Sequence, residues 1–237
     1  MPAARYLIVN ADDFGQSPGV NRGIVAAHEH GIVTSASLMV RWPGAAEAAA
    51  YSRTHRQLSL GIHIDLGEWA FRQDSWVPLY EVVPLGDASA VAQEVSRQIE
   101  AFHRLVGRPP THIDSHQHVH REEPVRSAVL AIAHKLDIPV RHCSGQVRYC
   151  GRFYGQTTDG SPLPDAISRD ALIKILAELE PGVTEMATHP GTGDDLDSMY
   201  RSERTREMEV LTDARTRAAI DEMGIELRSF DSIARQQ

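Results

Sequence analysis

Apolar runs rich in β-branched residues alternate along this chain with segments of helical periodicity. The alternation continues from end to end and favours an α/β fold with a mostly parallel sheet, either a barrel or an open wound sheet. The strand-like runs are 5–13, 32–40, 58–66, 109–116, 138–142, 183–190 and 225–230. The helix-like segments are 18–30, 43–55, 89–106, 122–137, 168–180 and 203–223. Seven strands nearly fill the eight of a regular (β/α) ring, which favours the barrel.

Two segments interrupt this alternation. Residues 67–88 contain two of the three tryptophans and no clear period, which predicts a long functional loop or lid. Residues 143–166 are rich in Gly, Ser, Pro and Thr, which predicts a second irregular insertion. Neither segment resembles a linker, and no repeat is present, so we expect a single domain over residues 1–237.

Polar side chains gather where the apolar strands end. The carboxyl ends of parallel strands meet on one face of an α/β fold, and that face holds the active site. We therefore expect side chains from five predicted strands to be neighbours in space. They are Asp12 and Asp13, His63 and Asp65, Asp114, His116 and His118, Arg141 and His142, and His189.

The stretch "THIDSHQHVH" (111–120) is the most unusual of these strand ends. Its four histidines and Asp114 fall on every second position, which in a strand would point them to one face. Two imidazoles and a carboxylate can hold a divalent ion and leave positions open for water and substrate. The sequence therefore predicts a metal site at the strand ends, with a further carboxylate available as a general base.

Other interpretations of the same residues stay open. A single buried histidine is usually a core residue, Asp-Asp after a strand is often a helix-capping turn, and the alternating histidines could form a solvated edge. The coincidence of several strands switching to Asp or His at one end argues against packing alone, because a buried charge is costly unless it is paired.

A family resemblance follows from five motifs taken in order. "IVNADDFG" (8–15), "GIHIDL" (61–66), "THIDSHQHVH", "FYG" (153–155) and "THPG" (188–191) resemble the YdjC-like carbohydrate deacetylases, a group that includes chito-oligosaccharide and hopanoid-associated deacetylases. The resemblance implies a distorted (β/α) TIM-like barrel of the glycoside hydrolase/deacetylase type. It also implies a metal-dependent enzyme that removes an acetyl group from an N-acetylated sugar.

The resemblance also implies roles for individual residues. Asp13, His63 and His116 match the metal ligands, for one divalent ion that is Mg²⁺ or Zn²⁺. Asp12 matches the general base, and His189 matches a general acid or oxyanion stabiliser. The residues expected to contact substrate are Tyr154, Arg141 and His118. One departure is "DLGEWAFRQDSW" (65–76), where many members have a Thr-containing stretch; here Asp65 and Glu68 stand in it.

Composition limits the partners and the location. The net charge of -8 makes a nucleic acid an unexpected partner, and no apolar run is long enough to span a membrane. The N-terminal sequence enters a strand at once, and the two cysteines do not form a disulfide framework, so we expect a cytoplasmic protein. We expect a small acetylated sugar as substrate and keep a homodimer as one expectation of assembly.

Two rival functions remain on the same scaffold. The first is another metal-dependent hydrolase that acts on a phosphoester or a different amide. The second is a non-catalytic carbohydrate-binding protein, which is expected to have lost the base or a metal ligand. No glycine-rich phosphate loop follows the first strand and no G-x-S-x-G elbow occurs, so a nucleotide site and a serine hydrolase are not supported.

Overall fold

A curled parallel sheet forms the centre of the molecule in this computed structural model, which describes residues 3–193, 195–196 and 198–234. The strand order is β6-β3-β2-β1-β8-β7, and β9 also pairs with β1. Every pairing in this sheet is parallel. The strands are β1 (Arg5–Phe14), β2 (Ser35–Leu38), β3 (Ser59–Ile64), β6 (Ile113–Ser115), β7 (Val147–Cys150), β8 (Gly182–Thr188) and β9 (Ile225–Leu227).

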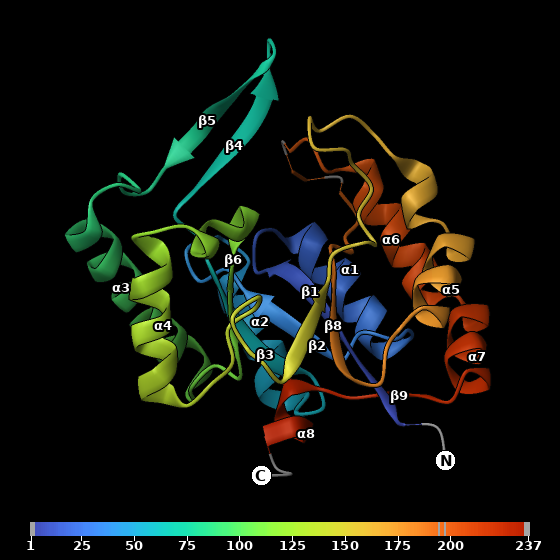
Figure 1. Cartoon of the computed structure of the whole chain (residues 1–237). Coiled ribbons are helices and arrows are strands. Elements are labelled where there is room, and N and C mark those ends of the chain that lie inside the picture. Colours follow the sequence, from blue (N-terminus) through green and yellow to red (C-terminus); the bar gives the residue numbers. More distant parts are fainter. Residues whose placement is uncertain (1–2, 194, 197, 235–237) are drawn as a thin grey trace.

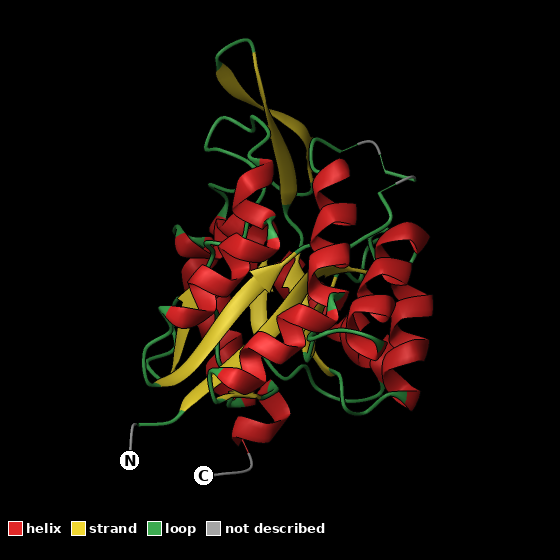
Figure 2. Ribbon diagram, turned by 90° about the vertical axis from the view of Figure 1, so that its right-hand side faces the viewer, coloured by secondary structure: helices red, strands yellow, loops and turns green. Residues whose placement is uncertain are grey.

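Helices cover the outside of this sheet (Figures 1 and 2). Their ends follow local capping signals: the Ser17 hydroxyl accepts a hydrogen bond from the Val20 amide at 3.1 Å, and Gly107 ends α3 with φ 76°. The α-helices are α1 (Pro18–Glu29), α2 (Ala45–Thr54), α3 (Ala88–Val106), α4 (Val125–Leu136), α5 (Arg169–Ala177), α6 (Ser202–Thr212), α7 (Ala214–Glu222) and α8 (Phe230–Ala234).

The predicted distorted barrel is confirmed, in an open form. In the described residues the path of paired strands runs from β6 at one edge to β7 at the other, and these two edge strands do not pair with each other.

The segment 67–88 is not the irregular loop that we predicted. It contains an antiparallel hairpin of β4 (Gly67–Arg72) and β5 (Ser75–Glu81), which projects from the barrel (Figure 1). The turn residues Gln73 and Asp74 have φ values of 49° and 60°. Two consecutive positive φ values are typical of a tight hairpin turn, which usually uses Asn-Gly or Asp-Gly. Gln-Asp therefore gave no clear turn signal.

Three further element predictions were wrong. Residues 138–142 form no strand: Val140 makes only an isolated bridge to Ile113, and the chain turns at His142, which has φ 63°. The strand that follows this turn, β7, lies within residues 143–166, which we predicted to be irregular. The helix predicted over 203–223 is two helices, because Asp213 has an extended backbone and its side chain caps α7.

The histidine-rich stretch also departs from the predicted strand. The strand β6 ends at Ser115 and a 3₁₀ helix, η1 (His116–Arg121), begins, with φ 50° at Gln117 and 56° at His118. The histidines therefore do not share one strand face. His112 is interior: its ring stacks on Phe230 with centroids 3.8 Å apart and packs over Gly61, where a Cβ would lie 2.4 Å from the ring.

Candidate metal centre and active site

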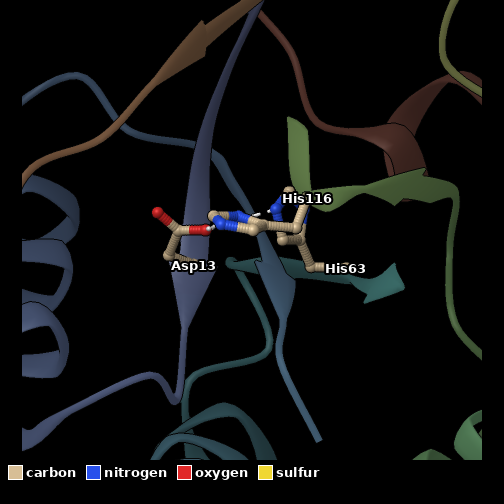
Figure 3. Close-up of side chains that lie close together, drawn as sticks. All are labelled: Asp13, His63 and His116. Carbon is tan, nitrogen blue, oxygen red and sulfur yellow. Dashed lines mark hydrogen bonds and ion pairs between the residues drawn. The ribbon is translucent and has the colours of Figure 1, made fainter. Parts of the chain in front are cut away.

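Three predicted metal ligands converge at the carboxyl ends of β1, β3 and β6. His63 Nε2 and His116 Nδ1 each lie 3.2 Å from Asp13 Oδ1 (Figure 3). Asp13 has φ 66°, and the pairing of β1 with β2 shifts register between Ala11 and Phe14, so this irregular end of β1 brings the carboxylate to the two imidazoles.

The spacing of these three atoms fits a divalent ion. Two donors bound to one ion at about 2.0–2.2 Å lie about 3 Å apart, close to the distances seen here. Asp13 and His63 are buried, and the His116 side chain is 12% exposed, so the group opens to solvent on the His116 side. Asp-His-His is the ligand set that the sequence predicted, and its donors fit a metal site; the structure does not identify the ion.

A second cluster of possible ligands lies beside the Asp13, His63 and His116 group and has a different role. Asp12, His63 and Asp114 also lie close enough to hold an ion. The carboxylates of Asp12 and Asp114 are already paired with Arg141, which lies within 2.8 Å of each. We therefore assign this group to the support of the first one and not to a second metal.

Asp114 fixes the orientation of the His63 ring. Its Oδ1 lies 2.7 Å from His63 Nδ1, while its Oδ2 accepts a hydrogen bond from Ser37 Oγ at 2.6 Å. Burial alone would lower the pKa of His63, but the Asp114 and Asp13 carboxylates outweigh it and raise that pKa to about 10. A carboxylate partner of this kind is how a ligand histidine is oriented and made more basic.

Arg204 occupies the other oxygen of Asp13. Its Nη2 donates to Asp13 Oδ2 at 2.6 Å and to Gln16 Oε1 at 3.2 Å, and the side chain is buried. Burial would raise the pKa of Asp13, but Arg204 and the two histidines hold it well below its usual value. With Oδ2 paired, Oδ1 is the oxygen left to face the two imidazoles.

Asp12, the predicted base, is held by a bidentate arginine. Arg141 Nη1 donates to Asp12 Oδ2 at 2.6 Å and Nη2 to Oδ1 at 2.7 Å. Burial would raise the pKa of Asp12, but Arg141 outweighs it and lowers that pKa. The Arg141 side chain is 0% exposed and also pairs with Asp114 and Glu185. The structure therefore places Arg141 behind Asp12 and not on the cavity wall, where we expected it to contact substrate.

His189 also lies near the Asp12 carboxylate. Its Nε2 is 3.8 Å from Asp12 Oδ2, and its ring packs near Tyr154 and Tyr200 with centroids 5.5 and 5.4 Å away. Burial lowers the pKa of His189 to about 4, with Asp12 and Asp13 offsetting only part of the effect. The imidazole is thus neutral near pH 7 and can act as an acid only after it takes up a proton.

A buried carboxyl group holds this aromatic wall in place. Glu207 Oε2 accepts from the His189 amide at 2.6 Å, and Glu207 Oε1 accepts from the Tyr200 hydroxyl. Tyr200 in turn stacks on Tyr154, with centroids 4.7 Å apart and ring planes 11° apart. Tyr154 is 38% exposed and lines the cavity, as expected of a residue that contacts substrate.

Substitution of Glu207 by Gln is expected to change the pH dependence of stability. Burial raises the pKa of Glu207 from 4.5 to about 8, despite hydrogen bonds that oppose the shift. The stabilisation from the protonated group is fully present below about pH 4.5 and is lost as pH rises through about 8. Relative to Glu207→Gln, the wild-type unfolding free energy should fall with a slope of up to about 1.4 kcal/mol per pH unit. Chemical denaturation from pH 5 to 8 measures this, and parallel curves would contradict it.

His118, the third residue expected to contact substrate, lines the cavity beside Tyr149. Its Nε2 lies 3.2 Å from the Tyr149 hydroxyl. Burial and the nearby Arg141 lower the pKa of His118 to about 3, so the ring is neutral. The pair therefore offers polar, uncharged groups to a ligand.

The cavity above the metal ligands has a volume of about 530 Å³. Its floor is polar, with Asp12, Asp13, His63, His116 and His189, and its walls include aromatic side chains. Aromatic faces pair well with the apolar faces of sugar rings. These wall residues come from the hairpin, from 149–154 and from the segment before α6; they are Trp69, Trp76, Tyr149, Phe153, Tyr154 and Tyr200.

The sequence analysis missed several residues of this site. Arg204 and Glu207 lie on α6, a helix whose buried positions include three charged residues. Glu207 lies three and four positions after the other two, so the three charged residues share one face of the helix. That spacing was the signal that could have revealed them. Glu185 interrupts the apolar strand β8 and pairs with Arg141 at 2.6 Å, and Tyr200 gave no pattern signal.

No helix within the described residues is long and apolar enough to cross a membrane.

Two curated proteins are similar to this chain over nearly its whole length. The chain is 34% identical to the chitooligosaccharide deacetylase of Serratia marcescens, covering 97% of this chain and 99% of that protein. It is also 34% identical to the carbohydrate deacetylase of Brevibacillus brevis, covering 96% and 99%.

Solved structures show the same fold. A protein of Enterococcus faecalis V583, named for cellobiose-phosphate cleavage, matches with a TM-score of 0.76 and 28% identity over 98% of this chain and 99% of that one. A family 4 carbohydrate esterase from Streptomyces lividans matches with a TM-score of 0.53 and 12% identity, over 95% and 92% of the chains. The YdjC-like protein family model matches residues 6–222, and the chain therefore belongs to that family.

Proposed function

We propose that this protein is a metal-dependent deacetylase that hydrolyses the acetamide of an N-acetylated sugar and releases acetate. The observation that carries the proposal is the carboxylate of Asp12 next to the cluster of Asp13, His63 and His116, on the floor of an aromatic-walled cavity. The names of the two relatives at 34% identity support the same substrate class.

Each residue of the site has a part in this reaction. Asp13, His63 and His116 would hold a divalent ion, which supplies polarisation of the acetamide carbonyl and a lowered pKa for attacking water. Asp12, held by Arg141, accepts the proton of the attacking water. Its neighbour His189, 3.8 Å away and neutral, can relay that proton to the nitrogen of the departing amine. The aromatic walls orient the sugar and exclude water.

The donor set favours zinc over magnesium. Two of the three ligands are imidazoles, which suit Zn²⁺, whereas Mg²⁺ prefers oxygen ligands. We therefore propose Zn²⁺ as the working ion.

Phosphoester hydrolysis is less well supported by the charges of the cavity. Arg204 is the one arginine or lysine among the described residues that line it, and it is paired with Asp13. A dianionic phosphate would find no unpaired guanidinium or ammonium there. The non-catalytic alternative is less well supported, because it predicts loss of the base or a metal ligand, and Asp12, Asp13, His63 and His116 are all present. Cytoplasmic location and homodimeric assembly remain proposals.

Turnover of a matched substrate panel tests the function. The zinc-loaded enzyme should release acetate from N-acetylglucosamine oligomers, and it should not release phosphate from generic phosphoesters. Release of phosphate without acetate would replace the proposal with phosphoester hydrolysis. Binding of the oligomers without any turnover would favour the carbohydrate-binding alternative.

A further inference from the structure

The outer nitrogen of His116, Nε2, has no hydrogen-bond partner in the part of the chain that the structure describes. The ring turns Nδ1 toward Asp13, so Nε2 points away from the metal ligands, and this atom is buried with no hydrogen bond in the described residues. A neutral imidazole that offers the lone pair of one nitrogen to a metal carries its proton on the other. His116 Nε2–H therefore needs an acceptor.

The other ligand histidine already has one. His63 Nδ1 lies 2.7 Å from Asp114 Oδ1, in the interior of the barrel. A buried donor without an acceptor costs about 1–3 kcal/mol of desolvation. The two ligand histidines thus differ at the nitrogen that faces away from the metal ligands: in His63 this nitrogen is bonded to the Asp114 carboxylate, and in His116 it is bonded to none among the described residues.

Glu68 is the carboxylate that faces the unpartnered nitrogen. Its Oε2 lies 3.9 Å from His116 Nε2, and its side chain is 14% exposed and lines the cavity. Glu68 is not in the group whose ligand atoms converge on Asp13, so it is not placed to bind the same ion. A shift of about 1 Å would bring the two atoms to hydrogen-bond distance.

The hairpin that carries Glu68 is tied to the segment that carries His116. The Gln117 side chain accepts a hydrogen bond from the Trp69 amide at 2.9 Å and donates one to the Trp69 carbonyl at 2.8 Å. Opposite Trp69 stands Pro78, which has no amide hydrogen, and the ladder shifts register between Glu68 and Trp69. Such an irregularity redirects a side chain, and here Glu68 is directed to the cavity.

From these contacts we propose that Glu68 is the positioning residue for His116. Its carboxylate accepts the Nε2–H hydrogen bond, fixes the tautomer that presents Nδ1 to the metal, and makes metal affinity depend on the placement of the β4–β5 hairpin. This inference rests on the proposed function, because it requires the metal site. It concerns the stretch where this chain departs from the pattern expected of its family.

Zinc affinity of the full-length protein tests the inference. Zn²⁺ dissociation constants would be measured by chelator competition for wild type, Glu68→Ala, Glu68→Gln and Glu81→Gln. Glu81 is the matched control, because it is an exposed carboxylate on the other strand of the same hairpin. Removal of a carboxylate that orients a ligand histidine typically weakens metal binding 10–100-fold. We expect such a loss in Glu68→Ala, a smaller one in Glu68→Gln, whose amide oxygen still accepts, and none in Glu81→Gln.

Cobalt spectra separate positioning from direct ligation. The Co²⁺-substituted Glu68→Ala protein should keep the visible band shape and intensity of wild type, and its metal-free melting temperature should be unchanged. Wild-type zinc affinity in Glu68→Ala, an equal loss in Glu81→Gln, or a changed cobalt coordination number would overturn the inference alone. If wild type and Asp13→Ala bind zinc equally weakly, the proposed function fails and the inference fails with it.

Discussion

Asp12→Asn is expected to reduce acetate release by about 10²–10⁴-fold while zinc remains bound. The amide cannot accept a proton from the attacking water, so the loss should appear in kcat and not in zinc affinity. Asp12 stands outside the group of Asp13, His63 and His116, and its carboxylate is already paired with Arg141. Turnover and chelator competition on the same preparation measure both quantities.

Two results would contradict this expectation. Retained turnover would remove Asp12 as the base. Loss of zinc together with turnover would instead place Asp12 among the metal ligands, in the group that it forms with His63 and Asp114. The melting temperature of the variant controls for a general loss of structure, because an asparagine leaves part of the Arg141 hydrogen bonding unmade.

Arg141→Met is expected to destabilise the fold by about 3–5 kcal/mol. Arg141 is fully buried and pairs with Asp12, Asp114 and Glu185 at 2.6–2.8 Å. Methionine fills much of the same volume but leaves three carboxylates close together in the interior without their shared cation. These three carboxylates would have to bind protons or become hydrated in the interior. Either change costs free energy and destabilises the folded state.

Denaturant unfolding near pH 7 measures the effect of Arg141→Met. Arg141→Lys is the graded comparison, because an ammonium keeps the charge but cannot make the bidentate contact with Asp12. It should therefore recover part of the stability. A methionine variant as stable as wild type would show that the three carboxylates do not depend on the arginine.

The alternation of apolar strands and helices predicted the α/β fold, because each pair of parallel strands must be joined by a crossover connection, which is usually a helix. The same pattern located Asp12, Asp13, His63 and His116, since parallel strands bring their carboxyl ends together and the structure does so. The hairpin was missed because its Gln73-Asp74 turn lacks glycine, and β7 was missed because four residues among Gly and Ser carry little periodic signal.

The residue roles that the sequence did not predict depend on contacts between side chains far apart along the chain. The role of Arg141 depends on a bidentate contact with Asp12 across 129 positions, and that of Arg204 depends on a single hydrogen bond to Asp13 across 191 positions. Neither distance follows from local pattern. The alternation of histidines in 111–120 was misleading, because the left-handed backbone at Gln117 and His118 gives each histidine its own environment.

Acetate release from N-acetylglucosamine oligomers, measured on chelated enzyme and after return of a single metal, tests the central claim most directly. Wild type should be inactive after chelation and recover with Zn²⁺, and Asp13→Ala should remain inactive with the same addition. Full activity of the chelated enzyme, or of Asp13→Ala, would contradict a metal-dependent deacetylase built on Asp13, His63 and His116.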